Sequence, residues 1–207
     1  MDGSTRVSGA RRPLVGALLA AAMVLVLGTI WAMRRSPEPV EAAPRTPLAK
    51  LVRTDQAVWR ALEPQPRPGD GFHDEPMKLV RGRAELELAA GTRIVLEAPA
   101  EFTFTGPNSI DLHRGKLAAT VPPQATGFTI TTMTARIVDR GTQVGVFASK
   151  GGNFQIATIE GKVEVIPHDG TPPMLLEAGQ SAMLTNTGLA RTEYNPSIYT
   201  FTLEGAE

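Results

Sequence analysis

The feature that most constrains the fold is an alternation of apolar and polar residues that begins after Met77. In residues 84–88, for example, Ala, Leu and Leu alternate with two glutamates. Because successive side chains of a β-strand point to opposite faces, this period of two predicts half-buried strands. The same period recurs at residues 102–105, 117–121, 128–132 and 162–165. No stretch between 77 and 189 shows helical periodicity, so an all-β domain is expected.

Glycines separate the predicted strands at intervals typical of turns. The last four, at positions 161, 170, 179 and 188, are nine residues apart. Short strands at such spacing indicate either a sandwich built from hairpins or coils of a β-solenoid. We therefore predict an antiparallel sandwich or a twisted β-solenoid-like domain over residues 77–188, followed by a C-terminal tail at 189–207.

A proline-rich stretch, residues 34–76, precedes this domain. Proline removes amide donors and favours extended backbone, so most of the stretch is predicted to be a semi-rigid linker. Residues 48–60 within it are ambiguous. Leu48, Leu51, Val58 and Leu62 fit a helical stripe, whereas Leu51-Val52 and Val58-Trp59 fit two short strands separated by residues 54–56.

Residues 13–33 are 21 residues without a charge, which predicts a transmembrane helix. At about 1.5 Å per residue, such a helix spans roughly the 30 Å of a bilayer core. Arginine pairs bracket the segment, and Trp31 sits at an interfacial position. A cleaved signal peptide is the alternative, but the apolar region is too long for one. Residues 1–12 then form a short tail, and the flanking arginines balance, so charge leaves the orientation open.

Bulk composition excludes several classes of function. The chain has no cysteine, which excludes disulfides and thiolate chemistry. Residues 36–207 carry a net charge of −4 and no basic stripe, so no nucleic-acid partner is expected.

No set of residues indicates catalysis, and no enzyme activity is predicted. The three histidines, His73, His113 and His168, lie far apart in sequence, so neither a metal site nor a cofactor is expected. Glu85 and Glu87 alternate with leucines, which favours a solvated strand face over a carboxylate pair.

A strand–turn–strand pattern over residues 128–146 carries the main functional signal, with Asp139-Arg140-Gly141-Thr142 as its turn. Further motifs occur in a fixed order around it: the strand at 79–86, the hairpin at 91–102, Leu112-His113-Arg114-Gly115-Lys116-Leu117, the strand pair at 159–165, and Leu176-Glu177-Ala178-Gly179-Gln180. In this order, residues 77–185 resemble the FecR domain family. The chain departs from many relatives at Met133, where they have proline. The resemblance also favours strands over a helix at 48–60, because the family opens its domain that way.

The resemblance implies a bacterial inner-membrane protein with one membrane pass. Its N-terminus would be cytoplasmic, and its β domain would be periplasmic. It implies transmembrane signalling to transcription in the anti-sigma lineage, with a protein partner in the envelope or membrane. The 12 residues before the predicted helix are too few for a folded sigma-binding domain. A tethered envelope module that binds polysaccharide or protein without signalling is the alternative.

The four signature residues, Asp139, Arg140, Gly141 and Thr142, are predicted to be mainly structural. Gly141 suits a backbone conformation that a Cβ would disfavour, and Thr142 can hydrogen-bond a neighbouring backbone group. Asp139 and Arg140 would form a local ion pair or a contact with a partner.

Overall fold

The computed structural model describes residues 45–203. The predicted tail 1–12, the predicted membrane helix 13–33 and the first part of the predicted linker lie outside the described residues. Between residues 45 and 203, the structure contains no helix with the length and hydropathy that crossing a bilayer requires.

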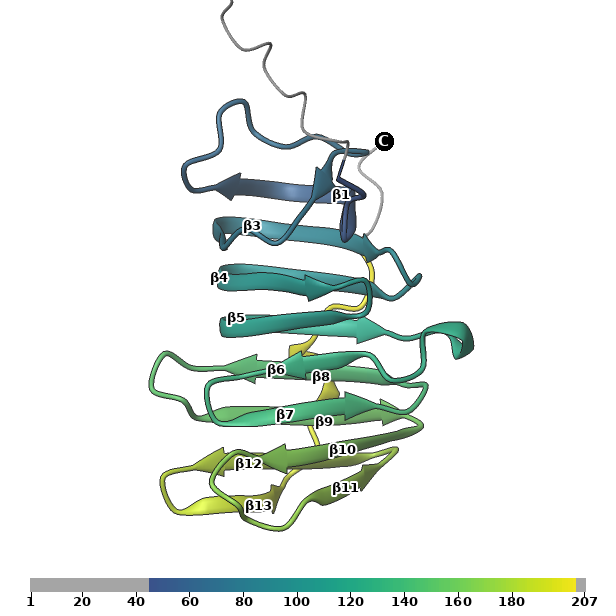
Figure 1. Ribbon diagram of the computed structural model, residues 1–207. Helices are drawn as coiled ribbons and strands as arrows, with labels where there is room; N and C mark the ends of the chain where they lie inside the picture. Colours follow the sequence, from purple (N-terminus) through teal and green to yellow (C-terminus); the bar gives the residue numbers. More distant parts are fainter. Residues whose placement is uncertain (1–44, 204–207) are drawn as a thin grey trace, which may run out of the picture. The chain divides into compact units, whose positions relative to one another are not determined.

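The described unit is built almost entirely from β-strands (Figure 1). The strands are β1 (Ala49–Trp59), β2 (Gly71–Phe72), β3 (Met77–Leu88), β4 (Arg93–Gly106), β5 (Ser109–Thr120), β6 (Thr129–Thr131), β7 (Ala135–Asp139), β8 (Gln143–Ala148), β9 (Phe154–Glu160), β10 (Lys162–Pro167), β11 (Met174–Glu177), β12 (Gln180–Thr185) and β13 (Gly188–Thr192). Two 3₁₀ turns complete it, η1 (Pro123–Ala125) and η2 (Pro196–Ile198).

The strands form one hydrogen-bonded sheet that forks at β5. Residues 109–111 of β5 pair with β6, whereas residues 115–120 pair with β8. One branch continues through β7, β10 and β11, and we call it the first layer. The other continues through β9, β12 and β13, and we call it the second layer. The predicted all-β class with antiparallel strands is confirmed. Among the described strand pairings, only β5–β6 is parallel.

Hairpins alternate between the two layers along the chain. The hairpins β6–β7 and β10–β11 belong to the first layer, and β8–β9 and β12–β13 belong to the second. This alternation explains the nine-residue glycine spacing. Gly161 and Gly179 lie where the chain changes layer, whereas Gly170 and Gly188 lie in the hairpin turns. The repeat therefore reflects strand length plus a turn, and the neighbouring strands are antiparallel rather than the parallel strands of a β-helix.

The long strands β3, β4 and β5 contribute to both layers because each bends near its middle. Gly115 marks the bend of β5, with a φ of +121°. A Cβ there would stand 2.7 Å from the Cα of Ala100, in the bend of β4. The three bends therefore stack closely, and a side chain at Gly115 would separate them.

Alternating apolar side chains from both layers fill the space between them. Phe102, Phe104, Ile110 and Leu112 are fully buried there. The phenylalanines meet edge to face, with ring centroids 5.4 Å apart. Trp59 of β1 extends this cluster, with its ring 6.2 Å from that of Phe102.

Both expected boundaries of the β domain differ from the structure. Within the predicted linker, β1 is a single strand that pairs with β3 from Ala49 to Trp59, rather than two short strands. Bulged residues near Gln56, which has a φ of +49°, allow β1 to follow the bend of β3. Beyond residue 188, β13 pairs with β12, and buried Tyr199 and Leu203 pack on the domain. Apolar burial thus extends past 77 and 188 at both ends.

Candidate functional site: the signature turn and the outer faces

The signature turn carries the chain from β7 in the first layer to β8 in the second. The Oδ1 atom of Asp139 accepts a hydrogen bond of 2.6 Å from the Gly141 amide. This is an Asx turn, in which the carboxylate substitutes for a backbone carbonyl. Gly141 has a φ of +88°, in the left-handed region expected for this position.

Backbone hydrogen bonds join this turn to three neighbouring segments. The Gly127 amide donates to the Asp139 carbonyl, the Arg140 amide donates to Lys162, and the Val121 amide donates to Thr142. Gly161, in the next layer change, lies directly against the turn. A Cβ on Gly161 would stand 2.5 Å from the carbonyl oxygen of Gly141. The turn is therefore packed at the centre of the corner between the layers.

Asp139 is buried, with 1% of its surface exposed. Desolvation raises its pKa to about 6, although hydrogen bonds from the Gly141 and Thr142 amides oppose the shift. Its Oδ2 atom and the hydroxyl of Thr142 are both buried without a hydrogen-bond partner. The corner therefore holds polar groups that pack inward, away from any partner surface.

Arg140 points the other way, and it does not form the ion pair with Asp139 that was one of the two expected alternatives. Its Nη2 atom lies 2.7 Å from the Oε2 atom of Glu164 on β10, rather than pairing with Asp139. The Arg140 side chain is mostly exposed. A surface groove of about 430 Å³ beside the turn is lined by Arg140 and Glu160, together with threonine, proline and glycine residues. Among the four signature residues, Arg140 is thus the one placed to meet a partner.

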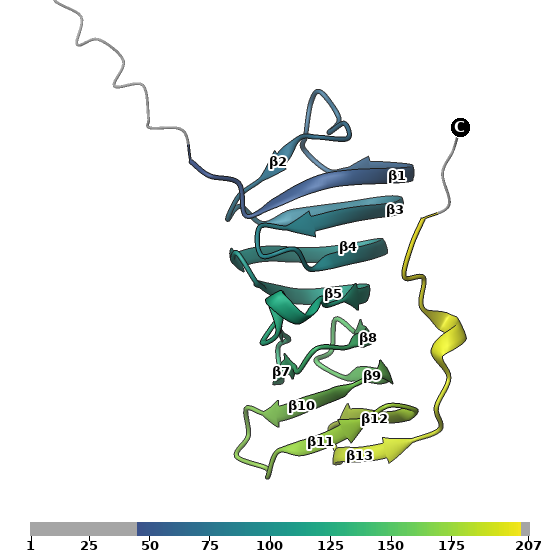
Figure 2. The same ribbon diagram turned by 90° about the vertical axis from the view of Figure 1, so that its right-hand side faces the viewer.

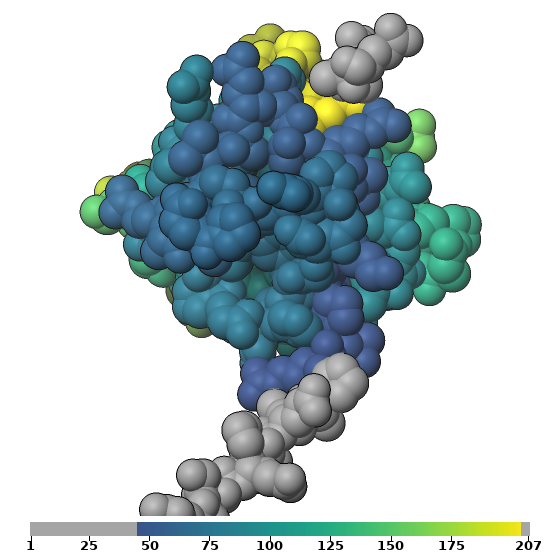
Figure 3. Space-filling view, turned by 90° about the horizontal axis from the view of Figure 1, so that it is seen from above, coloured from purple at the N-terminus to yellow at the C-terminus, as the bar shows by residue number. Residues whose placement is uncertain are grey.

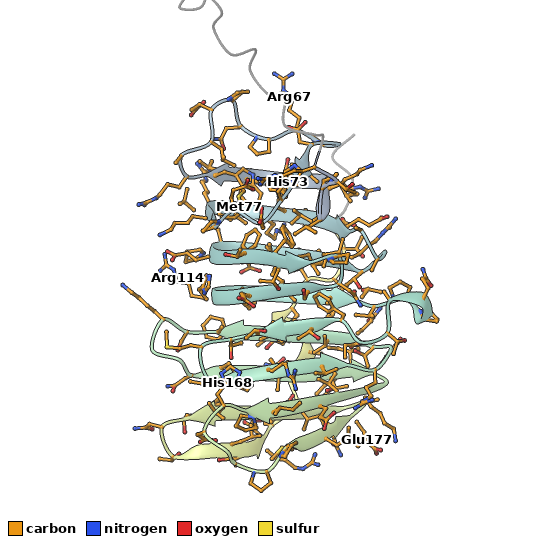
Figure 4. The ribbon with its side chains drawn as sticks, in the orientation of Figure 1. Arg67, His73, Met77, Arg114, His168 and Glu177 are labelled. Carbon is orange, nitrogen blue, oxygen red and sulfur yellow. The ribbon has the colours of Figure 1, made fainter. Side chains whose placement is uncertain are left out.

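His73 and His168 lie at different levels of the strand stack (Figure 4). Within residues 45–203, no cluster of histidine and carboxylate side chains could hold a metal ion. Glu97 pairs with Lys116 at 3.0 Å and therefore has a cationic neighbour.

Glu85 corrects an expectation, because only 3% of its surface is exposed. Its Oε2 atom accepts a hydrogen bond of 3.3 Å from the Leu203 amide. The strand face that alternation marks as solvated is covered here by a segment from the C-terminal end of the chain. Alternation within β3 could not reveal this cover, which comes from 118 residues away.

The outer faces of the two layers differ. The first layer presents a mixed face, on which Thr129, Thr131, Arg136 and Glu164 alternate with Val138, Ile166 and Leu175. The second layer is crossed by residues 193–203, which we call the strap (Figure 2). Beneath the strap, Ala118 and Ala157 pack against Tyr199. In the sequence, alanines at outward-facing strand positions could have indicated that this face is covered. They do not indicate which segment covers it.

Comparison with known proteins agrees with the motif order. Residues 79–164 match the family model described as FecR protein. Two solved structures of a putative anti-sigma factor from Parabacteroides distasonis ATCC 8503 share the fold, each at 19% identity, with TM-scores of 0.51 and 0.50. Each match covers 58% of this chain and 60% of the other. No curated protein matches the chain in sequence. The matched residues run from β3 to β10, so this part of the chain is similar to the FecR family.

Proposed function

We propose that this protein is a membrane-anchored FecR-like regulator whose β domain binds a protein or ligand outside the cytoplasm and takes part in transmembrane signalling to transcription. The observation that carries the proposal is the FecR domain over residues 79–164. The fold shared with a protein described as an anti-sigma factor is consistent with it. The match covers only 60% of that protein's length, so we do not assign its whole activity to this chain.

The anchor in this proposal is the uncharged segment 13–33, with the N-terminus cytoplasmic and the β domain periplasmic. Its length and flanking arginines support membrane insertion. The exposed Arg140 side chain beside the surface groove at the signature turn supports a binding role. A partner protein would carry the signal onward.

The test compares the transcriptome of a deletion strain with that of its parent. The strain is complemented either by the full chain or by residues 36–207 exported without the anchor. We expect a compact set of genes to change and only the anchored form to restore it. Immunoblots confirm that both forms reach equal amounts in the envelope.

The contrary result is an unmoved transcriptome together with an envelope defect that the exported domain alone corrects. That result would assign the protein to the tethered, non-signalling binding modules and overturn the proposal.

A further inference from the structure

A row of small side chains runs across the outer face of the second layer, perpendicular to its strands. The strand registers place Ser181, Ala157, Gly145 and Ala118 opposite one another on β12, β9, β8 and β5. The row continues to Val95 on β4 and Glu85 on β3. Larger side chains stand two residues along the same strands, at Lys116, Phe147, Gln155 and Met183. Small residues bordered by large ones form a groove.

The strap lies in this groove with an aromatic ring at its centre. The three atoms nearest to a Cβ built on Gly145 all belong to the Tyr199 ring, at 2.3 to 2.6 Å. Glycine is therefore required at position 145 for the ring to reach the sheet. The Tyr199 hydroxyl donates a hydrogen bond of 3.4 Å to the Gln155 carbonyl. Ile198 and Phe201 pack beside the ring.

Side chains of β1 and β3 hold the far end of the strap through its backbone. Arg53 of β1 donates a hydrogen bond of 3.0 Å to the Leu203 carbonyl, and Glu85 accepts one from the Leu203 amide. The strap thus crosses the layer from β13 to β1, as its yellow trace shows in Figure 2. Viewed from above, its end lies beside the residues of β1 and the loop that follows (Figure 3).

The strap covers the floor of the groove but is held there, within the described residues, without strand-like hydrogen bonds. Within residues 193–203 as the structure describes them, no backbone–backbone hydrogen bond reaches a strand. The Ser181 hydroxyl at the start of the groove is buried without a hydrogen-bond partner. Along the border, Phe147 and Met183 remain 43% and 37% exposed. A longer apolar segment could contact this uncovered border, and a polar atom of that segment could pair with Ser181.

We propose that this groove is a peptide-binding surface that the strap occupies in cis. The ligand it fits is an extended segment of a partner protein, with an aromatic residue above Gly145 and apolar residues on both sides. The strap itself defines this chemistry, because it shows which side chains the groove accepts. A partner segment binds by replacing the strap, whose attachment to the same chain gives it an effective concentration on the order of millimolar.

The test uses the full chain in detergent micelles and a fluorescent peptide with the sequence of residues 194–203. Tyr199→Ala removes the ring that anchors the strap and frees the groove for the peptide. We expect this variant to bind the peptide at least about tenfold more tightly than the wild-type chain, because the competitor in cis is weakened. Ser197→Ala, at an exposed position of the same segment, serves as the matched control and should give a smaller gain.

Gly145→Ala in the Tyr199→Ala background identifies the site of binding. The Cβ atom of this alanine occupies the space that the tyrosine ring of the peptide needs. The double variant should therefore lose the gain, and a peptide with alanine at the position of Tyr199 should bind no form of the chain. Circular dichroism and urea midpoints verify that each variant is folded.

Equal peptide affinity for the wild-type, single and double variants would overturn the proposal, as would the absence of binding to a folded Tyr199→Ala chain. The peptide-binding groove rests on the binding role proposed above, but peptide binding is measured independently of signalling. A protein that binds the peptide and leaves transcription unchanged would contradict only the proposed function.

Discussion

At the scale of single residues, burial decides what the signature turn does. Asp139 and Arg140 are adjacent, yet Asp139 points into the corner between the layers and Arg140 points to the surface. Sequence analysis could identify the turn and its glycine. It could not assign the opposite environments of the two charged residues, because these depend on the strands packed around the turn.

Asp139 should make stability depend on pH between about 7 and 5. Its pKa of about 6 in the folded protein lies above the ordinary value of 3.8, so the folded state binds the proton more tightly than the unfolded state. The resulting stabilisation is present at low pH and is lost as pH rises through about 6.

Between pH 7 and pH 5 the wild-type chain should therefore gain about 1 kcal/mol from this group. Asp139→Asn should abolish this gain, as measured by urea midpoints at both pH values. All ionisable groups other than Asp139 are common to the two proteins, so their contributions cancel in the difference. Parallel pH profiles for the two proteins would show that the carboxyl is not perturbed.

Gly161 tests the close packing of the corner. Gly161→Ala forces a Cβ against the Gly141 carbonyl and strains a φ of +72°, so it should destabilise the domain by roughly 2–4 kcal/mol. Gly170→Ala is the matched control, since its φ is +84° but open space surrounds it. It should lose only about 1–2 kcal/mol. Similar losses in urea denaturation would show that backbone strain alone matters at Gly161.

At the scale of elements, β1 belongs to the β domain although proline surrounds it in the sequence. Two short strands and a helical stripe both fitted residues 48–60, because a bulge near Gln56 interrupts the alternation of a single strand. The bend of β3 imposes that bulge, and no local pattern in β1 reveals it. The pairing partner therefore settles the form of this strand.

Trp59 should consequently behave as a core residue. It is 3% exposed and packs against Phe72 and Phe102. Trp59→Ala should lower the free energy of unfolding by about 3–5 kcal/mol. Its neighbour Val58 is half-exposed, so Val58→Ala should change the free energy of unfolding by less than about 0.5 kcal/mol. If residues 48–60 were a linker, the two variants would be equally mild.

At the scale of the whole molecule, the chain returns on itself. The strap brings residue 203 back to Arg53 in β1, at the other end of the strand stack from β13 (Figure 2). This return covers the outer face of the second layer and leaves that of the first layer open. The two faces of the domain can therefore meet different partners.

Hydrogen exchange should separate the strap from the sheet. The amides of Thr200–Thr202 have no backbone–backbone partner in the described chain, so they should exchange without global unfolding. The amides of β4 and β5, paired on both sides, should exchange only with the global transition. Mass spectrometry of peptic fragments measures both. Equal protection of strap and sheet would indicate that the strap is an integral part of the folding unit.

The sequence alone determined the all-β class, the order of the motifs and the resemblance to the FecR family, because alternation and turn glycines are local consequences of strand geometry. Tertiary structure decided where the sheet forks, why glycines recur every nine residues, and which outward face is buried. Glu85 shows the reason. Its position in β3 fixes only that it points outward, whereas its burial depends on a strap 118 residues away, which lies along four small residues aligned across four other strands.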